Sequence, residues 1–255
     1  MKLFTNLMVC AAVSTLCNFA NAAQWQTRTV KNPLDGYTYS LNNNPWGDSD
    51  ATLHNDQFSY NATLSKKGGV VWTDTWSWPN GPVAAKAAFD LGYPECQLKG
   101  SWPIASLHSV RSIWHYKLHL VPGVQQGYDV AYDYYVVDTQ PGTASRTEIM
   151  IWTNYHYDGP IGKKVGSLHT AGTTWDVYFG MNGQMPVYSY LLHKGVMDNV
   201  DMDLLPFIKN GLEMHLKNGY AGYGKHGVLN EIDEGIEVHT GSGSLATSEV
   251  KTVVR

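Results

Sequence analysis

Residues 148–155 read EIMIWTNY, and this alternation is typical of a β-strand with two unlike faces. Successive side chains of a strand point to opposite sides, so Ile149 and Ile151 are expected in the core. Glu148, Met150 and Trp152 then share the other face. A carboxylate, a thioether and an indole in one row make a poor solvent surface, and they are predicted to face a ligand.

Similar runs, rich in Val, Tyr, Trp and Thr, recur on both sides of this segment. Turn signals such as Gln140-Pro141-Gly142 and Asn182-Gly183 separate them. Their spacing favours antiparallel strands joined by hairpins rather than strand–helix–strand units. The clearest of these runs are residues 128–138, 174–179 and 187–192.

One segment has a helical spacing instead of a strand spacing. Asn199 is suited to cap a helix that closes near Asn218-Gly219. Between these ends the apolar residues recur at every third or fourth position, and they are Met202, Leu205, Ile208, Leu212 and Leu216. Many strands and one amphipathic helix predict an all-β fold, an antiparallel two-sheet β-sandwich or jelly roll.

The amino-terminal residues 1–22 are predicted to be a cleaved signal peptide. Lys2 precedes an apolar stretch over residues 7–16, and Ala20-Asn21-Ala22 supplies the small residues that signal peptidase requires. The stretch is too short to span a bilayer, so no membrane partner is expected. Residues 23–255 are then one secreted jelly-roll domain, in which Cys96 is the single thiol and no internal disulfide is possible.

The composition excludes several classes of protein. The 255 residues are 43% hydrophobic and only 16% charged, which excludes a disordered chain. Lys and Arg number 18 against 22 Asp and Glu, and no basic run could follow a nucleic-acid backbone. His115 and His119 would share a strand face, but no tight Cys/His cluster completes a metal site. The sequence has no phosphate loop and no Gly-x-Ser-x-Gly elbow, so neither a nucleotide site nor a serine hydrolase is predicted. We expect a monomer that needs no metal and no cofactor.

Two further strands present acidic side chains away from the core. In residues 235–239, GIEVH, the apolar pair points inward, so Glu237 and His239 point the other way. In residues 131–135, AYDYY, Asp133 is turned away from its tyrosine neighbours. Two glutamates on separate strands are what a glycoside hydrolase needs, one to attack the sugar and one to hold a proton. Either glutamate alone is better explained as the exposed half of a strand, and a non-catalytic polysaccharide-binding sandwich is the alternative from another class.

The tryptophans divide between packing and binding. Trp72, Trp76 and Trp78 share one face of a strand, and at least two of them are expected in the core. Trp25 and Trp46 lie in turn-rich surroundings and are better candidates for rings that stack on a ligand.

These segments resemble glycoside hydrolase family 12, the compact jelly-roll endoglucanases. Residues 148–152 are similar to the family's nucleophile strand and residues 235–241 to its acid/base strand. Residues 43–47 resemble the amino-terminal Asn-Asn-x-Trp-Gly motif, residues 130–133 the strand with the helper aspartate, and residues 159–162 the loop that crosses the cleft. The resemblance extends from Gln24 to Gly243, nearly the whole predicted mature chain.

The resemblance implies a role for each matching residue. Glu148 is implied to be the nucleophile and Glu237 the general acid/base, with Asp133 hydrogen-bonding near Glu148. The residues implied to contact substrate are Trp25, Asn44, Trp46, Met150, Trp152, Pro160, Gly162 and His239. Two departures stand out: the spacing from Trp25 to Trp46 is longer than the family's, and His239 replaces a commoner aromatic residue.

The implied reaction is retaining hydrolysis of internal β-1,4-glucosidic bonds in cellulose or a related β-glucan, and such a glucan is the expected partner. Retention requires two carboxyl groups about 5–5.5 Å apart. A xyloglucan-specific endoglucanase and a xylanase of the sister jelly-roll family are the enzyme alternatives.

Overall fold

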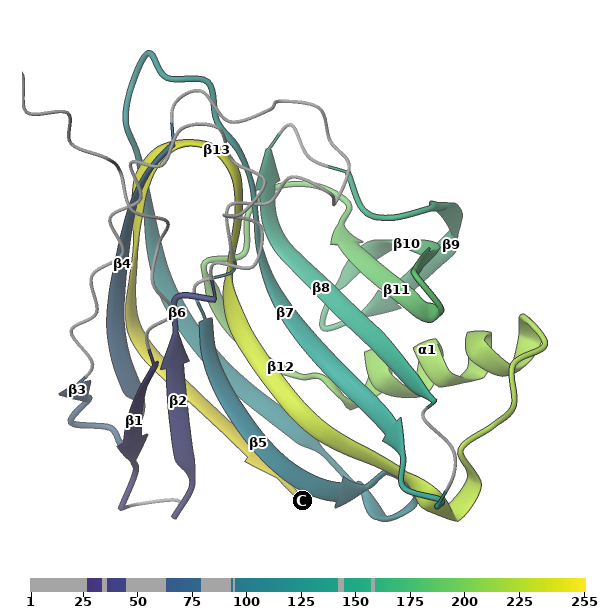
Figure 1. Ribbon diagram of the computed structural model, residues 1–255. Helices are drawn as coiled ribbons and strands as arrows, with labels where there is room; N and C mark the ends of the chain where they lie inside the picture. Colours follow the sequence, from purple (N-terminus) through teal and green to yellow (C-terminus); the bar gives the residue numbers. More distant parts are fainter. Residues whose placement is uncertain are drawn as a thin grey trace, which may run out of the picture.

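The computed structural model describes residues 27–33, 36–44, 63–78, 93, 95–141, 145–156 and 159–255. Most of these residues lie in β-strands (Figure 1). The strands are β1 Thr27–Lys31, β2 Thr38–Asn42, β3 Thr63–Leu64, β4 Val70–Trp78, β5 Glu95–Pro103, β6 Val110–Leu120, β7 Gly127–Asp138, β8 Arg146–His156, β9 Lys163–Thr170, β10 Thr173–Asn182, β11 Met185–Leu192, β12 Asn199–Asp203 and β13 Gly227–Val254. The helix α1 spans Leu205–Lys217, and short 3-10 turns occupy Ile104–Ser106 and Gly224–His226.

Two layers of sheet make up the fold, and β13 belongs to both of them (Figure 1). The larger layer has the strand order β1-β2-β5-β13-β7-β8-β11-β10-β9. The second layer pairs β4 and β6 with the far half of β13, and β3 and β12 extend it. The strand changes layer near Gly241, whose φ of +116° disfavours any residue with a side chain. This two-layer, strand-rich architecture with one helix is the jelly roll that the sequence predicts.

The core lies between the two layers and contains the residues that alternation assigned to it. Ile149 and Ile151 are fully buried there, and so is Trp72. Trp76 packs in the same cluster, so two of the three indoles on that strand face are core residues, as expected. The side chain of Trp78 lies outside the described part of the structure.

The core also holds two carboxylic acids that sequence reasoning did not single out. Glu234 is fully buried, and the Thr252 hydroxyl donates to its Oε1 at 3.0 Å. Burial raises the pKa of Glu234 to about 8. Asp74 is also fully buried, and burial raises its pKa well above the ordinary value. Burial therefore favours the neutral form of both groups.

The helix is confirmed, but its predicted start at Asn199 is wrong. Asn199–Asp203 is strand β12, paired with β6, so Met202 reaches the core from a strand. The helix begins only after Asp203, whose Oδ1 accepts the backbone N–H of Leu205 at 3.1 Å. The apolar spacing of three and four residues therefore continues from strand β12 into helix α1, although the backbone conformation changes between them. Within the helix, Gly211 allows close approach, because a Cβ there would lie 3.0 Å from Ile149 Cδ1.

The strand pairing is mostly antiparallel, with one exception beside the candidate nucleophile. The pairs β7–β8, β9–β10 and β10–β11 are antiparallel neighbours in sequence, as predicted. Strands β8 and β11 run parallel, with Glu148 opposite Val187. No helix among the described residues is long and apolar enough to cross a membrane.

Candidate active site

A cavity of about 600 Å³ opens on the face of the larger sheet that is turned away from the core. Glu148, Glu237 and Asp133 all line it. Most of the other groups in its wall are carboxyl, amide or hydroxyl groups, and they come from seven strands. The described lining residues are Thr27, Ser40, Asn42, Asn44, Tyr93, Glu95, Gln97, Lys99, Asp133, Tyr135, Arg146, Glu148, Asn182, Glu231, Asp233 and Glu237.

Glu148 lies near the start of β8, opposite Tyr135 of β7. Its side chain is buried, and Asn182 from the end of β10 hydrogen-bonds to it. Burial raises the pKa of Glu148 well above the usual range, the nearby Asp133 adds to this rise, and the Arg146 guanidinium opposes it. The nucleophile candidate is thus a partly desolvated carboxyl group with one nearby cation.

Asp133 and its partners form a small polar network beside Glu148. The Tyr135 hydroxyl donates to Asp133 Oδ2 at 2.6 Å, and the Arg146 guanidinium lies 3.4 Å from the centre of the Tyr135 ring. Burial raises the pKa of Asp133 to about 7, against the effects of Tyr135 and Arg146. The negative charge of Asp133 therefore makes it harder for Glu148 to lose its proton.

Glu237 reaches the same cavity from β13, at a different position along the strands. It lies opposite Asp129 of β7, and Asp129 is six positions before Tyr135, the residue opposite Glu148. Between these positions the Tyr93 hydroxyl donates to the carbonyl oxygen of Ala131 at 2.9 Å. The negative charges of Asp133 and Glu237 both contribute to the raised pKa of Tyr93, after the larger effect of burial. Tyr93 therefore lies between the two carboxyl-bearing parts of the cavity.

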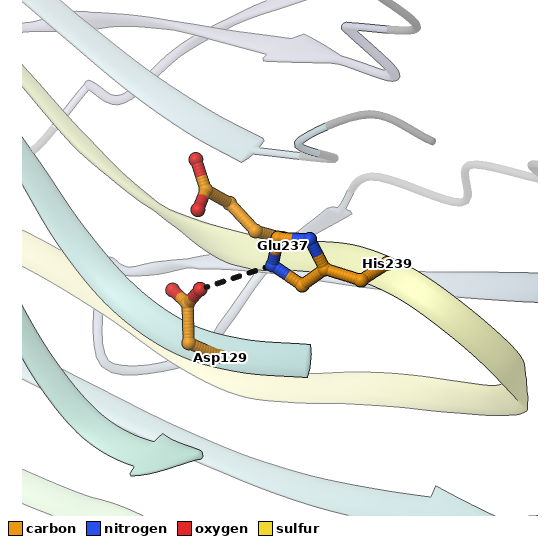
Figure 2. Close-up of side chains that lie close together, drawn as sticks. All are labelled: Asp129, Glu237 and His239. Atoms are coloured by element: carbon orange, nitrogen blue, oxygen red, sulfur yellow. Dashed lines mark ion pairs between the residues drawn. The ribbon is translucent and has the colours of Figure 1, made fainter. Parts of the chain in front are cut away.

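Behind Glu237, Asp129 and His239 face each other (Figure 2). His239 Nε2 is 3.7 Å from Asp129 Oδ2, and both side chains are buried. Neither residue lines the cavity. His239, implied to contact substrate, is thus packed against an aspartate in this structure.

Three more carboxyl groups line the cavity, and sequence reasoning missed them. Glu231 and Asp233 lie on the same face of β13 as Glu237, so extending the two-residue alternation backwards from Glu237 would have found them. Glu95 comes from β5, where Asn42 and Asn44 donate to its Oε1 at 3.2 and 3.4 Å. Burial raises the pKa of Glu95 to about 8. Asn44, predicted to bind substrate, is therefore at the cavity wall beside an acid.

The remaining predicted contact residues lie in other places. Met150 and Trp152 share the face of Glu148, but they are buried in a second apolar cluster and do not line this cavity. Pro160 is partly buried, and Gly162 approaches β10 so closely that a Cβ would clash with the Phe179 carbonyl oxygen. Neither of these two lines the cavity. Trp25 and Trp46, together with the predicted signal peptide, lie outside the described residues.

A jelly roll whose open face gathers carboxyl groups of differing proton affinity, among amides and hydroxyls, has the groups that a glycoside hydrolase needs. The sequence profile of glycosyl hydrolase family 12 matches residues 37–253, and the chain belongs to that family.

Known relatives agree with this assignment. Xyloglucan-specific endo-β-1,4-glucanase A of Emericella nidulans is 29% identical over 255 residues, covering 97% of this chain and 96% of the relative. A probable xyloglucan-specific endo-β-1,4-glucanase A of Aspergillus terreus is 30% identical, with coverage of 90% and 85%.

Solved structures show the same fold. Endoglucanase 3 of Trichoderma harzianum, from family GH12, superimposes with a TM-score of 0.71 at 23% identity, covering 92% of this chain and 96% of its own. The catalytic domain of Humicola grisea Cel12A, in complex with a thio cellotetraose, has a TM-score of 0.70 at 25% identity, with coverage of 89% and 99%.

Proposed function

We propose that this chain is a secreted, retaining endo-β-1,4-glucanase with Glu148 as nucleophile and Glu237 as general acid/base. The observation that carries the proposal is that Glu148 and Glu237 line one cavity together with Asp133, from separate strands of one sheet. Membership of family 12 supports the same assignment.

In the first step, the Glu148 carboxylate attacks the anomeric carbon while the bond from that carbon to the bridging oxygen breaks. Glu237 gives its proton to the departing oxygen, so the leaving chain departs as an alcohol. A glycosyl ester on Glu148 remains. In the second step, the Glu237 carboxylate takes a proton from water, and the water oxygen displaces Glu148 from the anomeric carbon.

The neighbours of Glu148 have supporting roles in this proposal. Attack requires an ionised Glu148, and the negative charge of Asp133 opposes that ionisation, so the pair must release a proton before the first step. Arg146 and Asn182 stabilise the ionised form of Glu148. Asn44 bonds to a sugar hydroxyl at the cavity wall, and Trp25 and Trp46 stack on glucosyl units. Met150, Trp152, Pro160 and Gly162 are assigned no direct contact with substrate in this proposal, because none of them lines the cavity.

Variants of the two glutamates test the mechanism. Glu148→Gln is expected to lose hydrolysis of every substrate. Glu237→Gln is expected to lose polysaccharide hydrolysis by about 10²–10⁴-fold, yet to keep forming the glycosyl-enzyme from a dinitrophenyl glycoside, whose leaving group needs no proton. Asp233→Asn is the matched control, because Asp233 lies opposite Asp133 and is also buried. Loss of the acid function in Asp233→Asn, with Glu237→Gln active, would overturn the assignment of Glu237.

Product stereochemistry is a second test. NMR of the first products is expected to show the β-anomer, because two displacements restore the configuration. Initial release of the α-anomer would refute the retaining mechanism.

Xyloglucan is the second candidate substrate, because the curated relatives at 29% and 30% identity are named for it. Parallel assays on carboxymethyl cellulose, mixed-linkage glucan, xyloglucan and xylan decide between the two. Activity on xyloglucan alone would narrow the substrate, and activity on xylan alone would refute both candidates.

Secretion is supported by the signal-like sequence of residues 1–22. Amino-terminal sequencing of protein recovered from the culture medium is expected to begin at Ala23.

A further inference from the structure

The surroundings of Glu237 contain a charged pair that the proposed mechanism does not use. Asp129 is fully buried and lies directly across from Glu237 in the β13–β7 register. His239 follows Glu237 by two positions, so both side chains leave β13 on the same face (Figure 2). One side-chain oxygen or nitrogen atom from each of Asp129, Glu237 and His239 lies within 4.8 Å of the corresponding atoms of the other two. Glu237 reaches the cavity, whereas Asp129 and His239 remain behind it.

These distances couple the charges of the three groups. Two carboxyl groups this close resist being ionised together, so the negative charge of Asp129 favours the protonated form of Glu237. A charged imidazole has the opposite effect on Glu237, and the buried carboxylate beside His239 favours that charged imidazole. The proton on Glu237 therefore depends on a neighbouring anion and a neighbouring cation that partly cancel.

Other titratable groups lie on the strands around Glu237. Tyr155 of β8 lies opposite Asp129, and its hydroxyl donates to the Leu192 carbonyl oxygen at 3.3 Å. Tyr93 and Glu95 lie on the β5 side, where burial raises the pKa of Glu95 to about 8. These groups are neutral in weakly acidic solution, so among the described residues the Asp129–His239 pair supplies the charge that changes next to Glu237.

We propose that Asp129 and His239 are positioning residues that together set the highest pH at which Glu237 keeps its catalytic proton. The inference rests on the proposed role of Glu237 as acid/base. With the pair intact, the two opposite charges cancel. Without His239, Asp129 and Glu237 share one proton and hold it to higher pH. Without Asp129, the imidazolium acts on Glu237 without the opposing charge of that aspartate and drives the proton off at lower pH.

The test is the pH dependence of kcat/KM on a soluble β-1,4-glucan, measured with EDTA present so that no divalent cation bridges the three side chains. Asp129→Asn is expected to move the upper, alkaline limb down by about one pH unit, and His239→Phe to move it up by a similar amount. The double variant is expected to return close to the wild-type limb. His239→Gln, which keeps hydrogen bonding without charge, is expected to follow His239→Phe.

Opposite shifts distinguish this role from a structural one. Thermal unfolding identifies any variant that fails to fold, and the remaining variants still decide the question. Shifts in the same direction, or no shift in stably folded variants, would overturn the proposal.

An NMR titration of the His239 ring is independent of activity. The ring is expected to lose its charge at lower pH in Asp129→Asn than in the wild type, and an unchanged titration would count against the pair. The proposed function itself is tested separately. It would be refuted if the Glu237→Gln variant hydrolysed polysaccharide at the wild-type rate.

Discussion

The two ends of the candidate catalytic cavity, one at Glu148 and the other at Glu237, contain similar residues but differ in charge. Each candidate glutamate has an aspartate of β7 nearby, Asp133 for Glu148 and Asp129 for Glu237. The cation beside the first pair is the Arg146 guanidinium, and the group beside the second pair is the His239 imidazole, which is a cation only when protonated. The nucleophile end thus has a fixed positive charge, whereas the charge at the acid/base end depends on whether the imidazole is protonated.

The strongest test of this contrast removes the nucleophile itself. Glu148→Gln is expected to lower kcat by more than about a thousandfold on every substrate, because no glycosyl ester can form. Oligosaccharide binding, measured by calorimetry, is expected to remain. Release of reducing sugar at the wild-type rate by this variant would refute the assignment of Glu148 as nucleophile, and with it the comparison of the two ends.

A smaller effect is expected from Asp133→Asn. Because Asp133 raises the pKa of Glu148, removing its charge lets Glu148 ionise at lower pH. The lower, acid limb of kcat/KM is expected to move down, with about a tenfold to hundredfold loss at the optimum as Tyr135 loses an ionised acceptor. An acid limb that stays in place would mean that the two carboxyl groups are not coupled.

Arg146→Gln is expected to have the opposite sign and a smaller size. The Arg146 guanidinium lowers the pKa of Glu148, so its loss moves the acid limb up, by less than about one pH unit because the arginine is largely exposed. Arg111→Gln, at an exposed ion pair on β6, is the matched control and is expected to leave the limb unchanged. A downward shift in Arg146→Gln would contradict a fixed positive charge at this end.

The smallest effect on activity is expected from Glu234→Gln, in the core behind both ends. Its pKa is raised from 4.5 to about 8, so the folded protein keeps a proton that the unfolded chain loses. This group's stability contribution is full below about pH 4.5 and is lost as the pH rises towards 8. At pH 8 the variant is expected to be more stable than the wild type, by on the order of a few kcal/mol in chemical denaturation.

The control for that measurement is Glu213→Gln on the exposed surface of α1. It is expected to change stability little at any pH. Equal pH dependence of unfolding in the wild type and Glu234→Gln would show that the core acid is not protonated on folding.

Sequence patterns predicted correctly which side of a strand each residue faces. They did not predict which residues on that side line the cavity. Alternation placed Ile149 in the core and Glu148 and Glu237 on the other face, because a strand has only two sides. It could not show that Glu148 lines the cavity while Trp152 does not, since that depends on strands far apart in sequence. The same limit hid Glu95, which reaches the cavity only because β5 pairs with β13.

The predicted start of the helix at Asn199 was wrong for a related reason. Met202 fits the apolar period of α1, but the pairing of β12 with β6 decides its conformation. A local period therefore continued through a boundary that only tertiary contacts define. His239 is a third example, because its nearness to Asp129 follows from the register between β7 and β13, which no single strand encodes.

The passage of β13 through both sheets has a consequence for how the chain folds. Residues 227–254 pair with β4, β5, β6 and β7, all of which precede them by many residues. Neither layer can complete its hydrogen bonding until this late segment has been synthesised and inserted. Such non-local pairing makes folding slow. A chain whose sheets close late remains unfolded for longer, which suits the secretion proposed above.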